Sequence, residues 1–184
     1  MLELSTWVIH PDQLPARAGH SRDFTLQVPL DDGWGNDVAQ IPSGSTIAVQ
    51  GRMDGVVDGV MVDAAIAATV TSQCVRCLDE FTEDLTPPLC EMFFAPYAIK
   101  RLQEEGDDEA AELPQLGPQG LDLEQAVRDV VVGSLPFQPL CAEDCAGLCQ
   151  DCGTPWRELP ADHAHEQLDP RLAVLAQLLP TEEQ

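Results

Sequence analysis

The residues best suited to chemistry in this 184-residue chain are seven cysteines and a late pair of histidines. Four of the cysteines fall within residues 141–152, namely Cys141, Cys145, Cys149 and Cys152, and His163 and His165 follow them. Thiolate and imidazole are the usual protein ligands of zinc, which takes four of them in tetrahedral geometry. The pattern therefore predicts a zinc site in the C-terminal third of the chain.

The stretch Cys149-Gln-Asp-Cys152-Gly153 is the best core for this site. A Cys-x-x-Cys turn directs both sulfurs at one ion, and a glycine after the second cysteine relieves the turn. The other two ligands are either Cys141 with Cys145, the more local choice, or His163 with His165. Both pairs stay open at this point, since two histidines in a polar loop are also compatible with an ordinary surface.

A second Cys-x-x-Cys, Cys74-Val-Arg-Cys77, follows a long strand pattern and lacks the glycine. We expect it to be a separate thiol pair, or to dock against the C-terminal cluster as the second half of a ribbon-like site. A reduced, partly buried pair at a strand end is the plain alternative. The chain thus offers eight candidate ligands, enough for two sites, but the spacing favours a single zinc ion. Cys90 is left over and is expected to be a buried apolar residue.

The metal is expected to be structural, because a fully ligated zinc ion has no open position for water or substrate. A catalytic Cys-x-x-Cys of thioredoxin type opens a helix within a βαβ unit, whereas Cys74 and Cys77 lie between two antiparallel strand patterns. A Gly-rich phosphate loop, a nucleophile elbow and paired catalytic carboxylates are all missing from the sequence. We therefore expect no enzymatic activity, and a thiol redox protein is the less favoured alternative.

Charge and composition narrow the choice of partners and compartment. The chain has 32 acidic and 9 basic residues, a formal net charge of −23. Such a charge argues against a broad electrostatic hold on nucleic acid and suits basic protein partners, although it also serves solubility. No secretory signal is evident, and no apolar run approaches the roughly 20 residues that cross a bilayer. We expect a cytoplasmic protein with reduced thiols, no membrane association and no small-molecule substrate.

Alternating apolar residues predict an antiparallel sheet in the first half of the chain. The clearest strands follow residues 46–53 and 60–71, joined by a turn at Asp54–Gly59 into one long hairpin. A further strand is expected over Phe81–Phe94, where Pro87-Pro88 must cause a bulge or mark an edge. A short strand around Leu4–Ile9 and one along Phe24–Val28 complete this set.

Two helices are expected in the second half. Asp122 caps a helix whose apolar stripe runs from Leu123 to Val131 and which ends near Gly133 and Pro136. Asp169-Pro170 opens a C-terminal helix. The predicted fold is α+β: an antiparallel sheet, curled toward a barrel, with a packed helix, a Cys-rich zinc-binding segment and a C-terminal helix.

The expected organisation is one integrated domain in three parts. Residues 1–100 form a mainly antiparallel β region, residues 101–120 an acidic flexible insert, and residues 121–184 the helix, the Cys-rich segment and the C-terminal helix. The insert is assigned from its run of Asp and Glu among Pro and Gly, which is typical of solvated, mobile chain.

In their order and spacing these motifs resemble the YceD family, the bacterial large ribosomal RNA subunit accumulation proteins, in its actinobacterial or Gram-positive form. The matching stretches span about residues 45–180: Cys74-Val-Arg-Cys77-Leu78-Asp79, Arg128-Asp129, Leu135-Pro136-Phe137, Pro139-Leu140-Cys141 through Cys152-Gly153, and Asp169-Pro170-Arg171-Leu172-Ala173-Val174-Leu175. In many relatives a Cys-x-Cys follows the Gly-Leu-Cys-x-x-Cys-Gly stretch. His163-Ala164-His165 stands in its place here, and the resemblance therefore supports the histidines as ligands.

The resemblance implies a role in the synthesis, processing or stability of 23S rRNA. Some members of the family lack much of the cysteine cluster, so metal binding is not the shared function itself. We expect a non-enzymatic ribosome-biogenesis factor that binds a basic ribosomal protein or an rRNA-processing enzyme, more than RNA directly. The alternative is a zinc-stabilised protein-interaction module without a ribosomal role.

Overall fold

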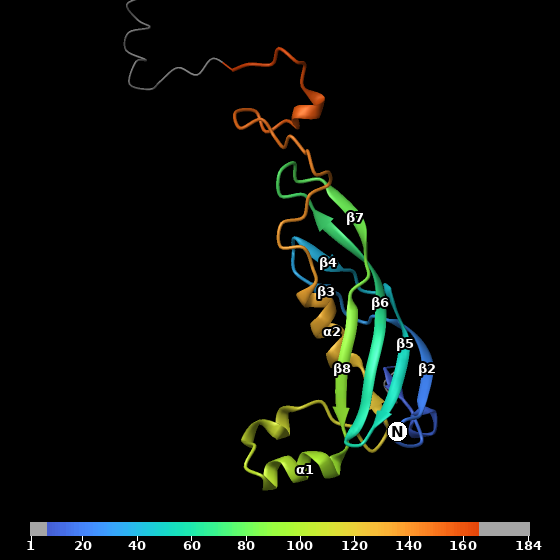
Figure 1. Cartoon of the computed structure of the whole chain (residues 1–184). Coiled ribbons are helices and arrows are strands. Elements are labelled where there is room, and N and C mark those ends of the chain that lie inside the picture. Colours follow the sequence, from blue (N-terminus) through green and yellow to red (C-terminus); the bar gives the residue numbers. More distant parts are fainter. Residues whose placement is uncertain (1–6, 166–184) are drawn as a thin grey trace, which may run out of the picture.

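Strand β6 (Gly59–Gln73) is the centre of the computed structural model, which describes residues 7–165 (Figure 1). One edge of β6 pairs with β5 (Thr46–Val56) and then with β4 (Ala39–Ile41). The other edge pairs with β8 (Pro88–Phe94) and then with β7 (Glu80–Leu85). β2 (Ser21–Pro29) extends the sheet beyond β5, and the short β3 (Trp34–Gly35) pairs with β4. All of these pairings are antiparallel.

The predicted hairpin of β5 and β6 is confirmed. The strands close at Val56 and Gly59 around a two-residue turn. Side chains at alternate positions of both strands are buried, including Ile47, Val49, Val62 and Ile66, while their neighbours along the chain face outward. One face of the sheet therefore carries the core, as expected for an antiparallel sheet with one solvated face.

The strand expected over Phe81–Phe94 is divided in two. β7 and β8 are separated at Thr86-Pro87, and the Pro87 carbonyl accepts a 3.1 Å hydrogen bond from the Ile66 amide. The prolines thus interrupt the strand without detaching it from β6. Cys90, expected to be buried, is exposed. The prediction was wrong because the β8 alternation turns Leu89 and Phe93 into the core and Cys90 to the opposite face.

Helix α2 (Glu124–Gly133) covers the core face of the sheet. Asp122 Oδ1 accepts a 3.0 Å hydrogen bond from the Glu124 amide, and the helix ends at Gly133 as predicted. Leu123, Val127 and Val131 are fully buried in the core that the sheet also lines. The expected fold class is confirmed as α+β, with a curled antiparallel sheet and a helix packed on it.

The range 101–120, expected to be an acidic flexible insert, contains regular structure. Helix α1 (Pro96–Glu104) enters it, with a proline at its first position and Ala98 and Ile99 buried. A 3₁₀ helix at Asp108–Glu112 follows and buries Ala110 completely. The carboxylates remain on the outside, so the acidic run is the solvated face of folded structure.

The remaining elements are short. β1 (Val8–Ile9) pairs with β9 (Leu121–Asp122), and 3₁₀ helices lie at Pro11–Gln13 and Trp156–Glu158. The first part of the strand expected around Leu4–Ile9 and the whole C-terminal helix expected from Asp169 lie outside the described residues. Within residues 7–165, no helix is long and apolar enough to cross a membrane.

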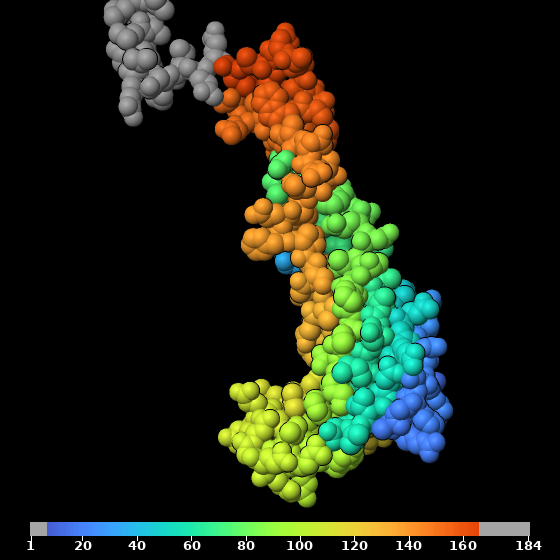
Figure 2. All heavy atoms as spheres, viewed as in Figure 1, coloured from blue at the N-terminus to red at the C-terminus, as the bar shows by residue number. Residues whose placement is uncertain are grey.

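The described chain is elongated (Figure 2). The sheet, α1 and α2 form a body, and the segment from about residue 138 to residue 165, here called the head, runs alongside the tip of the β6–β7 hairpin and continues beyond it (Figure 1). The core cluster contains none of the candidate ligands, all of which lie in the head or in the hairpin tip.

Candidate metal centres

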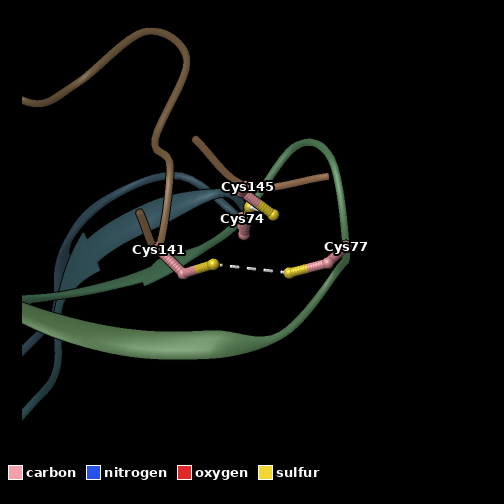
Figure 3. A group of neighbouring side chains, drawn as sticks. All are labelled: Cys74, Cys77, Cys141 and Cys145. Carbon is pink, nitrogen blue, oxygen red and sulfur yellow. Dashed lines mark hydrogen bonds between the residues drawn. The ribbon is translucent and has the colours of Figure 1, made fainter. Parts of the chain in front are cut away.

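The eight candidate ligands come together as two groups of four. The first contains Cys74, Cys77, Cys141 and Cys145, and the second contains Cys149, Cys152, His163 and His165. Within each group, all four potential ligand atoms lie within 4.8 Å of one another. Figure 3 shows the first group, in which the four sulfurs converge from the hairpin loop and from the incoming head segment. Each group has the ligand number and chemistry of a tetrahedral zinc site.

The first group begins in the loop between β6 and β7. The Leu78 amide donates to the Cys74 carbonyl at 2.8 Å, and the Cys74 amide donates to the Asp79 carbonyl at 2.8 Å. These two bonds close a tight knuckle with both sulfurs on its inner side. Cys74 and Cys77 are buried.

The second group begins in a knuckle with the same hydrogen bonds. The Gly153 amide donates to the Cys149 carbonyl at 2.9 Å, and the Cys149 amide donates to the Thr154 carbonyl at 2.9 Å. The residue after the second cysteine is left-handed in both knuckles, with φ of 69° at Gly153 and 63° at Leu78. The first pair is thus a knuckle of the same type, although a leucine occupies the position that favours glycine.

The head segment reaches the first knuckle through backbone contacts. The Val75 amide donates to the Pro139 carbonyl at 3.0 Å, which sets Cys141 opposite Cys77 with 3.5 Å between their sulfurs. Arg76 donates to the Cys145 carbonyl at 3.0 Å, and the Cys145 sulfur lies 3.8 Å from that of Cys74. These contacts join residues more than sixty positions apart in sequence, which is why spacing alone did not predict the pairing.

The histidines complete the second group from a following loop. His163 Nε2 lies 3.7 Å from the Cys152 sulfur, and the ring centroids of His163 and His165 are 4.5 Å apart. Trp156 packs edge-on against His163 at 5.6 Å. This group is more exposed than the first, since Cys149 alone among its four members is buried.

An ion pair joins the first knuckle to the part of the head that lies between the cysteines and the histidines of the second group. Arg157, in the 3₁₀ helix of the head, donates to Asp79 at the end of the first knuckle. That hydrogen bond lowers the pKa of the Asp79 carboxyl below its usual value. Arg157 is therefore held beside the first centre while the chain on either side of it belongs to the second.

The thiols have perturbed acidities. Burial raises the pKa of Cys74, but backbone hydrogen bonds from Cys141, Cys77 and Arg76 outweigh it and bring the pKa to about 6. Side-chain hydrogen bonds with Cys77 and Cys145 raise the pKa of Cys141 to about 12. Hydrogen bonds from the Thr154 side chain and backbone lower the pKa of Cys152 to about 6. Each group thus has one thiol already inclined to ionise, and a divalent cation in the first group would favour the thiolate of Cys141 as well.

Comparison with known proteins places the chain in a family. Residues 62–179 match the family described as large ribosomal RNA subunit accumulation protein YceD. The chain belongs to the YceD family. Uncharacterised proteins of Mycobacterium bovis and Mycobacterium tuberculosis are each 35% identical to it over 148 residues, which is 79% of this chain and 68% of the relative. One from Mycobacterium leprae is 33% identical over 145 residues, 79% of this chain and 64% of the relative. No solved structure matches.

The region matched to the YceD family includes both ligand groups. Cys149 and Cys152 lie together with His163 and His165, one of the two pairs that the sequence left open. Cys141 and Cys145 instead join Cys74 and Cys77, as in the ribbon-like alternative. The sequence favoured one zinc ion, whereas the geometry provides two complete ligand sets. Each set offers four ligands, so a tetrahedral ion in either would be closed to substrate.

Proposed function

We propose that this protein is a non-enzymatic, cytoplasmic ribosome-biogenesis factor that promotes the synthesis, processing or stability of 23S rRNA. Its membership in the YceD family carries the proposal, since the family is described by its effect on accumulation of the large-subunit RNA. Two structural zinc ions stabilise the head: the one in the first group joins it to the β6–β7 hairpin, and the one in the second group crosslinks the head itself. The ligand sets support a structural metal because neither leaves a position for a reacting group.

The factor acts by binding a basic ribosomal protein or an rRNA-processing enzyme. The formal charge of −23 supports a protein partner over direct contact with RNA, because a phosphate backbone is repelled by a surface of this sign. Arginines near the centres are engaged within the protein: Arg157 with Asp79, and Arg76 with the Cys145 carbonyl.

Depletion in the organism of origin tests the ribosomal role. We expect the ratio of 23S to 16S rRNA to fall and to recover when the wild-type chain is supplied again. An unchanged ratio would support a zinc-stabilised interaction module without a ribosomal role instead.

Co-purification from lysate with and without nuclease tests the kind of partner. We expect the partner proteins to remain bound after RNA digestion. Their complete loss on digestion would contradict recognition through protein.

The redox alternative has a separate test. Cys77 and Cys141 have sulfurs 3.5 Å apart, so oxidation of metal-free protein could join them as a disulfide. A structural centre predicts that the metal-loaded protein keeps all ligand thiols unreactive toward a thiol-specific reagent. Reversible disulfide cycling with the metal in place would identify a redox protein.

A further inference from the structure

Strand β8 has an open edge along the body of the molecule. The two-residue turn at Val56 and Gly59 makes the odd-numbered residues of β6 hydrogen-bond to β5 and the even-numbered ones to β8. On β8, Leu89, Glu91 and Phe93 therefore bond to β6. The backbone N–H and C=O groups of Cys90 and Met92 are directed away from the sheet.

Part of this edge is already used by a strand-like segment. The Phe94 amide donates to the Pro114 carbonyl at 2.8 Å, and the Leu116 amide donates to the Phe94 carbonyl at 2.9 Å. Within the described chain, no other backbone segment continues this pairing along Pro88–Met92. The Met92 amide has a long 3.3 Å contact with the Glu91 carboxylate in place of a strand partner. Unpaired strand edges of this kind are templates for an added strand.

A groove of about 640 Å³ runs between this edge and α2. Its floor is partly apolar, with Phe93, Ala126 and Val130 among the lining residues. No lysine or arginine is among the residues that line the groove. Its wall contains five carboxylates, those of Glu91, Glu112, Asp122, Glu124 and Asp129. The one cationic residue of α2, Arg128, is directed elsewhere and lies over the Trp34 ring.

The carboxylates of the groove have no internal cation. In the described chain no ion pair includes any of the five. Asp129 accepts from the Gln125 amide at 2.8 Å, and Asp122 accepts from the Glu124 backbone. Five negative charges along one groove repel each other unless a ligand of opposite charge lies among them.

We propose that the β8 edge and its groove bind an extended, lysine- or arginine-rich peptide segment of the partner protein, which adds to the sheet as a strand. Backbone hydrogen bonds to Cys90 and Met92 supply the pairing, and alternate side chains of the segment point into the groove, where its basic residues meet the carboxylates. The proposal deepens the proposed function by giving the class of segment that the partner supplies. That this segment comes from a ribosomal or rRNA-processing protein rests on the proposed function.

The substitution Cys90→Pro tests the β8 edge separately from the rest of the fold. The Cys90 amide faces outward, so Cys90→Pro removes an edge donor without removing a bond to β6, and proline is tolerated on strand edges. The charge contribution is tested by Glu91→Gln with Asp129→Asn. The matched control is Glu104→Gln with Glu105→Gln, which removes the same charge from the end of α1, outside the groove.

The probe is a short fluorescent peptide that alternates lysine with valine or threonine, titrated against the full chain by anisotropy at low salt. We expect Cys90→Pro and the groove double variant each to weaken binding about tenfold or more, equivalent to about 1.4 kcal/mol, and the α1 variant to leave it within about twofold. A glutamate version of the peptide should not bind. Thermal unfolding checks that each variant is folded, and amide exchange should show Cys90 and Met92 protected by the peptide.

Equal binding by wild type and both groove variants would overturn the proposal, as would binding without protection of the β8 edge. Expression of Cys90→Pro in depleted cells distinguishes failure of the groove proposal from failure of the proposed ribosomal role. If the peptide result holds while depletion leaves 23S rRNA unchanged, the proposed function fails and the groove stands. If wild type restores the rRNA and a variant that has lost peptide binding does so equally well, the groove is not the route to that function.

Discussion

At the scale of single residues, the residue that follows the second cysteine of each knuckle determines the backbone strain of the loop. Gly153 and Leu78 have nearly the same left-handed φ, 69° and 63°, but only leucine has a Cβ, which makes this conformation sterically unfavourable. A non-glycine residue in this region costs about 1–2 kcal/mol. The sequence has no glycine after Cys77, yet the loop keeps the same knuckle hydrogen bonds. Leu78 is also 56% exposed, so its side chain gains little from burial.

Substitution of Gly153 by alanine tests this backbone requirement. The added Cβ would contact nothing within 4 Å, so any effect comes from the left-handed φ. We expect Gly153→Ala to lower the free energy of unfolding of the metal-loaded head by about 1 kcal/mol. Gly133→Ala, equally uncrowded but without a left-handed φ, is the control and should be neutral or stabilising by about 0.5–1 kcal/mol. The two are compared by denaturant unfolding, and equal behaviour would argue against a strained knuckle.

The same reasoning predicts the opposite sign for Leu78→Gly. Relief of the left-handed strain favours glycine by about 1–2 kcal/mol, and the greater freedom of glycine in the unfolded chain returns about 0.4–1 kcal/mol. The variant should therefore be equal to wild type or up to about 1.6 kcal/mol more stable, with metal content unchanged. A marked loss of stability would mean that the exposed leucine makes contacts that its 56% exposure does not suggest.

At the scale of elements, the ligands were predictable and their partition was not. Cys-x-x-Cys spacing and the late histidines are local signals that a sequence shows directly. The partition depends on where the chain after α2 meets the β6–β7 hairpin, which is set by the Val75–Pro139 and Arg76–Cys145 contacts between distant residues. Helix α1 was missed for a different, local reason: Ala98 and Ile99 are its only buried positions and give too short an apolar pattern.

Metal content tests the partition. Native mass spectrometry of the purified chain is expected to show two zinc ions, one for each group of four ligands. Cys74→Ser with Cys77→Ser and Cys149→Ser with Cys152→Ser should each leave one ion. Cys141→Ser combined with the first pair should remove no further metal, because all three substitutions affect one centre. Cys90→Ser, outside both groups, is the control and should keep two. One ion in the wild type, lost on changing Cys149 and Cys152, would restore the single-site hypothesis.

At the scale of the whole molecule, the hydrophobic pattern was sufficient to predict the body. The β5–β6 hairpin, the core face and α2 all follow from alternation and helical spacing, since burial of Val, Ile and Leu determines each of them. The head has no comparable pattern: most of residues 141–165 are exposed, with Gly147 and Cys149 buried. The head has the knuckle hydrogen bonds and the Arg157–Asp79 ion pair in place of a core of its own, and the two proposed zinc ions would supply the rest of its stability.

Removal of metal should therefore separate the head from the body. Structural zinc contributes about 10–16 kcal/mol to folding of small sites, more than a segment without a core can replace. We expect a strong chelator to abolish amide-exchange protection in the head and the Cys74–Asp79 loop, while β5, the first part of β6 and α2 keep theirs, because the core cluster contains no ligand. Chelator already saturated with zinc is the control, and added zinc should restore protection. Simultaneous loss of protection in the head and the body would show instead that the centres hold the whole fold together.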